Sequence, residues 1–261
     1  MSRLCLLLMA LTAVASPAAA RAPQYIEAAL VAESMTPRPG HSILLGLQMN
    51  PKPGWHGYWS NPGESGLAPV ARWTAPGGVH IGALEHPAPT LVRVMGLTSY
   101  VHSGPHLLLA RLTLPPRLQA GTTLPLVADV TWAACSDRLC VPQKARLNLI
   151  LRVGNGSLSP FAAKLRHALA SQPKRAGGGS FQITRGNIIL ALPASVRLRL
   201  SATTFFPDEN GYWDPVKARV TSARPIRIAG PVVGKPPRWI TGVVSDGASA
   251  YRLRLKASPQ Q

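Results

Sequence analysis

The sequence predicts an all-β protein in which two β domains are joined by one helix. Apolar and polar residues alternate with a period of two in many short segments, which is the pattern of half-buried strands in antiparallel sheets. The 261 residues include 26 prolines and 23 glycines, which helix interiors tolerate poorly. Apolar residues make up 46% of the chain, so a sizeable core can be buried.

The expected strands are short and separated by turn signals. Alternation is clearest in 43–49, 124–132, 146–153 and 250–256. Further strands are expected at 24–33, 69–74, 79–84, 107–114, 181–185, 187–192, 195–200 and 239–244. Turn clusters such as Asn61-Pro62-Gly63 lie between them. Many short strands with such punctuation are typical of β-sandwiches.

One helix is expected between the two β domains. Ser159 can cap its N-terminus and Pro160 suits the first helical position. Apolar residues then recur at helical spacing until Pro173, which a run of glycines follows. We therefore expect a first β domain over 21–153, a helix and linker over 154–180, and a second β domain over 181–261.

The first twenty residues have the features of a cleavable export signal. Arg3 provides a positive charge, and the apolar run that follows is about eleven residues long, too short for a bilayer core that needs roughly 20. Small residues lead to an Ala-x-Ala site that ends at Ala20. We expect residues 1–20 to be a signal peptide, cleaved after Ala20, and the mature protein to lie outside the cytoplasm.

Loss of the signal removes Cys5 and leaves one pair, Cys135 and Cys140. Five steps of an extended chain span ~16 Å, whereas a disulfide needs Cα atoms about 4.4–6.8 Å apart. Residues 136–139 must therefore turn the chain back if the two bond. The closed loop is so short that the chain-entropy account assigns the bridge only ~2 kcal/mol. Redox exchange, a structural clip and metal binding all stay open at this point.

Two motifs carry a family resemblance. Residues 54–69 read GWHGYWSNPGESGLAP, and residues 132–142 read WAACSDRLCVP. The first resembles the GWHxYWxNPGxSGxxP stretch in the N-terminal periplasmic region of DsbD/ScsB-type thiol:disulfide interchange proteins, and the second resembles the redox loop of that family. Phe205-Phe206-Pro207 is similar to an element of the family's second domain. The resemblance covers essentially the whole mature chain.

The resemblance implies an immunoglobulin-like β-sandwich that carries a reversible disulfide, hence a protein-disulfide reductase or interchange component. Cys140 matches the cysteine that forms the mixed disulfide with a partner, and Cys135 matches the one that resolves it. A short cap loop with an aromatic residue shields this pair in the family. The matching stretch runs from Leu97 to Tyr100, so we expect Tyr100 to be the shield with Leu97 beside it.

The resemblance also implies partners and a location. The family's domain receives electrons from a membrane-embedded thiol transporter and passes them to periplasmic thioredoxin-fold oxidoreductases. Family proteins commonly continue into transmembrane helices and a thioredoxin-like domain, which this sequence does not contain. We therefore expect a periplasmic, monomeric protein without cofactor or metal, whose electron donor is a separate chain.

A different class of function is a non-catalytic β-sandwich that binds copper or an envelope partner, with the disulfide as a passive clip. No His-x-His or Met-x-Met spacing supports a copper site. The aromatic residues of 55–59 could line a binding groove, but we expect them to pack in the core. The sequence has no Gly-x-Ser-x-Gly elbow and no phosphate-binding glycine motif.

The net charge of +18 raises the question of nucleic-acid binding. An export signal argues against that partner. Several basic residues alternate with apolar ones and are expected on solvent-exposed strand faces: Arg197, Arg199, Arg252, Arg254 and Lys256. A basic face of this kind can also steer acidic partners or attract anionic envelope surfaces.

Overall fold

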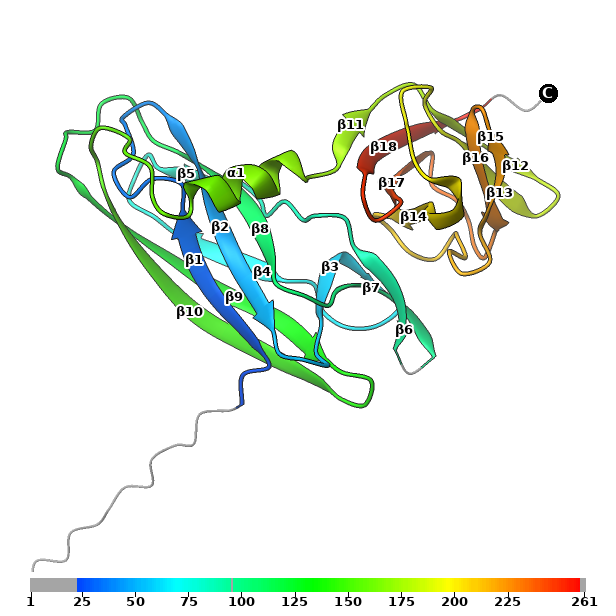
Figure 1. The fold of residues 1–261 in the computed structure, drawn as a ribbon, viewed down its shortest axis with the longest axis horizontal. Helices are drawn as coiled ribbons and strands as arrows, with labels where there is room; N and C mark the ends of the chain where they lie inside the picture. The colour runs from blue at the N-terminus through cyan, green and yellow to red at the C-terminus, as the bar shows by residue number, and fades with distance from the viewer. Residues whose placement is uncertain (1–22, 95, 259–261) are drawn as a thin grey trace, which may run out of the picture.

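The structure is a computed structural model that describes residues 23–94 and 96–258 (Figure 1). The predicted export signal over residues 1–20, with Cys5, lies outside the described residues. The predicted fold class is confirmed: an immunoglobulin-like β-sandwich is followed by a linker helix and a second β unit. Within the described residues, no helix combines the length and apolar character needed to cross a bilayer.

The first β unit is built from three antiparallel sheets. Its strands are β1 (Ile26–Ala32), β2 (Ser42–Pro51), β3 (Gly57–Gly63), β4 (Val70–Thr74), β5 (His80–Ile81), β6 (Thr90–Val94), β7 (Leu97–His102), β8 (His106–Thr113), β9 (Thr123–Cys135) and β10 (Cys140–Arg152). One sheet has the order β1-β2-β8-β5, the second β10-β9-β4 and the third β3-β7-β6. The third sheet lies at one end of the unit (Figure 1).

The core of the first β unit lies between the β1-β2-β8-β5 sheet and the β10-β9-β4 sheet. Strand β9 shows why the predicted alternation holds, because every second residue from Leu124 to Trp132 is buried. These side chains pack against apolar residues of the facing sheet, such as Leu45, Leu108 and Leu112.

Helix α1 (Ala162–Ala170) packs on the first β unit. Leu165 is fully buried among apolar side chains of β1, β2 and β8. The predicted N-cap is wrong by two residues, because Phe161 occupies that position. The Ser159 hydroxyl instead accepts the N–H of Phe161 (3.1 Å) and stabilises the turn that precedes the helix.

The second β unit is a single curled sheet that follows the helix (Figure 1). Its strands are β11 (Lys174–Ala176), β12 (Ser180–Thr184), β13 (Asn187–Ala191), β14 (Thr204–Pro207), β15 (Arg219–Ala223), β16 (Ile226–Pro231), β17 (Trp239–Ser245) and β18 (Ala250–Ala257), with a short 3-10 helix η1 at Leu200–Ala202. The strand order is β14-β17-β18-β12-β13-β16-β15, and β11 pairs with β18. Its own core includes Phe205, Ile240 and Leu255.

Two sequence expectations fail for identifiable reasons. Residues 195–200 form no strand, because the backbone N–H of Arg199 bonds the Asp246 carboxylate (2.8 Å) instead of a neighbouring strand. The Asn61-Pro62-Gly63 cluster is the end of β3 rather than a turn between strands. Pairing of β3 with β7 is interrupted between Tyr58 and Gly63, so Pro62 occupies an irregular part of the ladder.

Candidate functional site

The two cysteines lie at the tip of the longest hairpin in the first β unit. Strands β9 and β10 pair continuously, and Cys135 and Cys140 are the last pair of the ladder. They form a disulfide with an S–S distance of 2.06 Å and Cα atoms 4.1 Å apart. The expected pairing is confirmed, and the predicted turn over 136–139 joins the two cysteines directly.

The register of the sheet explains why these two positions can bond. The N–H of His56 donates to the Cys135 carbonyl (2.8 Å), and the N–H of Cys135 donates to the His56 carbonyl (3.0 Å). Since the backbone groups of Cys135 point toward His56, Cys135 faces Cys140 as a non-hydrogen-bonded pair. Side chains approach each other most closely at such pairs, where Cα atoms are about 4.5 Å apart.

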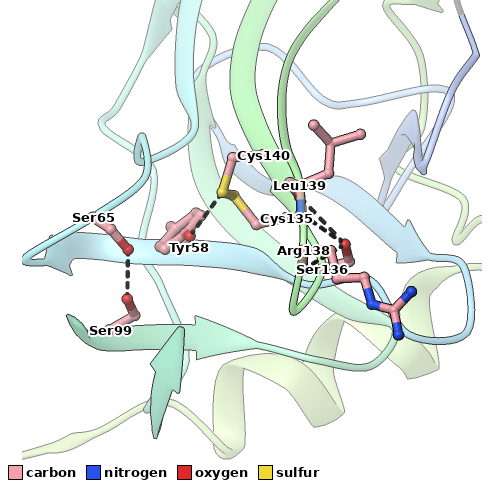
Figure 2. The surroundings of a disulfide bond; sticks show 8 residues. All are labelled: Tyr58, Ser65, Ser99, Cys135, Ser136, Arg138, Leu139 and Cys140. Atoms are coloured by element: carbon pink, nitrogen blue, oxygen red, sulfur yellow. Dashed lines mark hydrogen bonds between the residues drawn. A yellow bond between two sulfur atoms is a disulfide. The ribbon is translucent and has the colours of Figure 1, made fainter. Parts of the chain in front are cut away.

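The turn between the cysteines has its own hydrogen bonds (Figure 2). The backbone N–H of Ser136 donates to the Leu139 carbonyl (2.8 Å). The Ser136 hydroxyl oxygen accepts the N–H groups of Arg138 (3.3 Å) and Leu139 (3.2 Å). These bonds stabilise the turn in addition to the disulfide.

The two sulfur-bearing residues differ in exposure. Cys135 is fully buried, whereas Cys140 is half-buried. A thiolate from another protein can reach only an accessible sulfur, and attack through Cys140 leaves Cys135 as the departing sulfur. The asymmetry matches the roles that the family resemblance implies for the two cysteines.

Tyr58 of β3 shields the disulfide. Its ring is fully buried in a cluster with Cys135, Ala133 and Val101, and Cys140 packs against the same cluster. The hydroxyl lies 3.8 Å from the Cys140 sulfur and points toward it (Figure 2). A disulfide sulfur has no proton, so the Tyr58 hydroxyl is the donor in this contact.

The Tyr58 hydroxyl stays protonated at physiological pH. Burial raises its pKa above the ordinary value, and hydrogen bonding with Ser65 and Ser99 opposes the rise only in part. The Ser65 and Ser99 hydroxyls also bond each other (2.7 Å), which links the segment after β3 to β7 (Figure 2).

Gly66 makes room for the Tyr58 ring. Its φ is +82°, and a Cβ added there would lie 2.1 Å from the ring. Side chains rarely adopt this backbone conformation and none would fit the space. The glycine in the Ser-Gly part of the 54–69 motif is thereby explained by direct contact with the shield.

The structure places the predicted cap residues away from the sulfur atoms. Tyr100 is buried in another cluster, with Trp59 and Phe206, and Leu97 is exposed at the end of the β6–β7 hairpin. The neighbouring Val101 is the residue of β7 that packs near the disulfide. The sequence-based prediction did not identify Tyr58 as the shielding residue. Tyr58 and Trp59 are consecutive in one strand, so their side chains must lie on opposite faces of the sheet, and this signal could have singled out one of them.

Several histidines of the first β unit are buried or partly buried, and His56 pairs directly with Cys135. Burial lowers the pKa of His56 from its ordinary value, while the charge of Asp137 raises it in part. A further group includes His102 of β7, whose ring centroid lies 6.4 Å from that of His86 and 4.4 Å from that of His106. Across residues 23–94 and 96–258, no group of three or more His, Cys, Asp or Glu side chains is placed to hold a metal ion.

A groove of about 1040 Å³ opens along the same hairpin. Its lining includes Val141 and Pro142, which directly follow Cys140, together with Leu67 and Val70. Leu67 and Val70 are both more than half exposed. An apolar surface therefore adjoins the accessible cysteine.

The comparisons with known proteins agree on the first β unit. The family model described as "Thiol:disulfide interchange protein DsbD, N-terminal" matches residues 27–152. The crystal structure of the N-terminal periplasmic domain of ScsB from Proteus mirabilis is similar with a TM-score of 0.69 at 16% identity, over 94% of this chain and 96% of that chain. This likeness shows the fold of both β units.

Other solved structures are far less similar. The periplasmic chaperone SfaE has a TM-score of 0.27 at 12% identity, over 88% of this chain and 99% of that chain. The chaperone YadV has a TM-score of 0.25 at 10% identity, over 87% and 98% of the two chains. No curated protein sequence matches this chain.

Proposed function

Residues 27–152 match the family model of the DsbD N-terminal domain, and on that premise we propose that this chain relays electrons in the periplasm through a reversible Cys135–Cys140 disulfide. The observation that carries the proposal is the unequal burial of the two cysteines. Their bridge also adds little stability to a hairpin that is already paired along its whole length. A structural staple gains most where it closes a long loop. This bridge joins positions that the β9–β10 ladder already holds together.

Reduction of the pair begins at Cys140. A thiolate of a reduced donor attacks the Cys140 sulfur, a donor–Cys140 disulfide forms, and the Cys135 thiolate leaves. The second thiol of the donor then attacks its own sulfur in the mixed disulfide. The donor becomes a disulfide, Cys135 and Cys140 become thiols, and two electrons and two protons have moved to this chain.

Delivery of the electrons reverses the order. The Cys140 thiolate attacks the disulfide of an oxidised thioredoxin-fold acceptor and forms a new mixed disulfide. The Cys135 thiolate attacks Cys140, which releases the acceptor as a dithiol and restores the starting disulfide. Cys135 needs no access to solvent in either direction, consistent with its complete burial.

The surroundings of Cys140 support a protein partner on both sides of the cycle. The apolar groove beside Val141 and Pro142 offers a surface against which a thioredoxin-fold protein can dock. The proposed donor is a membrane-embedded thiol transporter, and the proposed acceptors are periplasmic oxidoreductases. We propose that the chain acts as a monomer between them.

Trapping of mixed disulfides tests this function. In a Cys135→Ser variant, Cys140 has no resolving partner and should form stable mixed disulfides with periplasmic thioredoxin-fold proteins. The Cys140→Ser variant should form few or none, because its remaining sulfur is buried. Absence of trapped partners in both variants would support instead a β-sandwich binding module with a passive clip.

The reduction potential of the wild-type disulfide gives an independent measure. Equilibration with thiol buffers of known potential should place it above about −300 mV, because structural bridges in secreted proteins lie below that value. A lower potential would contradict the relay.

A further inference from the structure

The two faces of the sheet that covers the disulfide contact different parts of the molecule. We call β3, β7 and β6 the shield sheet. Its residues Tyr58 and Val101 are direct neighbours across β3 and β7 and face the cysteines. The next residue on β3, Trp59, and the preceding residue on β7, Tyr100, face the opposite way. Because side chains alternate along each strand, the shield sheet contacts the disulfide with one face and a second set of residues with the other.

The second β unit packs against the far face of the shield sheet. Phe206 of β14 meets Tyr100 at a ring-centroid distance of 5.5 Å and Trp59 at 6.4 Å, both edge to face. Val243 of β17 is fully buried in the same cluster. The guanidinium of Arg252 lies 5.8 Å from the Trp59 ring centroid.

Polar contacts lock the same junction. The side-chain amide of Asn61, which is buried, donates to the Pro207 carbonyl (2.7 Å) and to the side-chain oxygen of Asn210 (2.9 Å). The Asn210 amide donates back to Asn61 (2.8 Å) and to the Gly63 carbonyl (2.7 Å). These bonds tie the irregular end of β3 directly to the segment that follows β14.

The two aromatic side chains of the segment Phe205-Phe206-Pro207 point in opposite directions. Phe205 points into the core of the second β unit, where it meets Trp213 edge to face at 5.8 Å. Phe206 points out of that core and into the shield sheet. Phe205 therefore anchors the segment in the second β unit, while the Phe206 ring contacts the shield sheet that covers the disulfide.

We propose that the second β unit is a clamp, in which Phe206 and Asn210 are positioning residues that hold Tyr58 and Val101 over Cys140. The proposal rests on the relay function and adds a role for the second β unit. With the clamp engaged, the shield sheet is fixed between the disulfide and Phe206, and Tyr58 restricts the approach of a thiolate. Release of the junction lets β3 and β7 move and exposes Cys140.

The rate of disulfide reduction by dithiothreitol in the oxidised full-length protein tests the clamp. Loss of the Asn210 bonds, or of the Phe206 ring, should make the shield sheet open more readily, and we expect the reduction rate to rise roughly tenfold. A tenfold rise corresponds to a loss of about 1.4 kcal/mol in the stability of the closed state. The variants are Asn210→Ala and Phe206→Ala. Asn187→Ala is the matched control, because its amide also donates to a carbonyl (Arg185) but within the second β unit.

Two further measurements separate a clamp from a general loss of structure. Each variant should keep the wild-type circular-dichroism spectrum, and faster amide exchange should be confined to the shield sheet and the junction. The rate increase of the Tyr100→Ala/Phe206→Ala double variant should be less than the sum of the two single effects, because both substitutions remove the Tyr100–Phe206 contact, although Phe206 also meets Trp59. Fully additive effects of the two substitutions would overturn the proposal.

The outcomes for clamp and relay are distinguishable. Reduction of Asn210→Ala and Phe206→Ala at the wild-type rate overturns the clamp even if mixed disulfides with partners are trapped. Faster reduction of both, with Asn187→Ala unchanged, supports the clamp even if no partner is trapped, since dithiothreitol replaces the partner.

Discussion

Gly66→Ala is the most direct perturbation of the shield that leaves both cysteines in place. The substitution adds one methyl group to a residue whose φ is +82°, at a point 2.1 Å from the Tyr58 ring. The ring is fully buried and cannot yield without moving away from Cys140 or from its neighbours in the cluster.

Two costs contribute to the expected loss of stability. A side chain in the left-handed region costs about 1–2 kcal/mol. Forcing an extra methyl into a filled site costs about 1–3 kcal/mol more. We expect the free energy of unfolding to fall by roughly 2–5 kcal/mol and the disulfide to be reduced faster than in the wild type.

Gly54→Ala is the matched control. Its φ is +79°, but among the described residues no heavy atom lies within 4 Å of the added Cβ. It should lose only the conformational part, about 1–2 kcal/mol, with an unchanged reduction rate. Urea unfolding gives the stabilities and dithiothreitol kinetics the rates. Equal losses and equal rates in the two variants would refute the view that Gly66 makes room for a shielding Tyr58.

Two other predictions concern stability. A Cys135→Ala/Cys140→Ala double variant should lose only about 2 kcal/mol in urea unfolding, because the bridge closes a loop of about six residues; a loss above about 4 kcal/mol would indicate a structural staple. Acid should destabilise the protein through its buried histidines, and the pKa of one of them, His86, is lowered to about 4, mainly by burial and secondarily by the nearby charges of His106 and Arg252. Since the unfolded chain binds the proton more tightly, stability should fall from pH 6.5 toward pH 4, by up to about 3 kcal/mol. The slope should flatten in His86→Gln, and an unaltered slope would show that another group is responsible.

The 54–69 motif is explained by the two faces of the shield sheet. Tyr58 contacts the disulfide, and Trp59 contacts the second β unit. Asn61 locks the junction between the units, and Gly66 accommodates the Tyr58 ring. The motif therefore joins the redox pair to the clamp, and its length reflects contacts on both sides of one strand.

Local patterns were enough to predict much of the fold. The alternation in β9 and β10 reports directly on burial, because each sheet of the sandwich has one apolar face. The strands of the shield sheet were harder to identify. Asn61-Pro62-Gly63 has the composition of a turn and keeps a local bond from the Gly63 N–H to the Asn61 side chain, and further contacts to it come from Asn210, far away in the sequence.

The basic residues divide in a similar way. Arg254 and Lys256 are exposed as their alternation predicts. Arg252 follows the same alternation, yet it lies at the junction, where it bonds Asp208 (2.7 Å) and approaches Trp59. Alternation shows which face of a strand a residue occupies, but it contains no information about what covers that face.

By itself the sequence determined the all-β class, the single helix and the one cysteine pair that a turn could bring together, because these follow from residue spacing along a strand or turn. Only the tertiary structure decided that Tyr58 rather than Tyr100 lies against the disulfide, that Cys140 is the accessible sulfur, and that Phe206 presses on the shield from behind. Those features depend on which strands become neighbours, and packing between segments far apart in the sequence sets that arrangement: 82 residues separate Tyr58 from Cys140, and Phe206 lies still farther along the chain from the Trp59 ring that it meets.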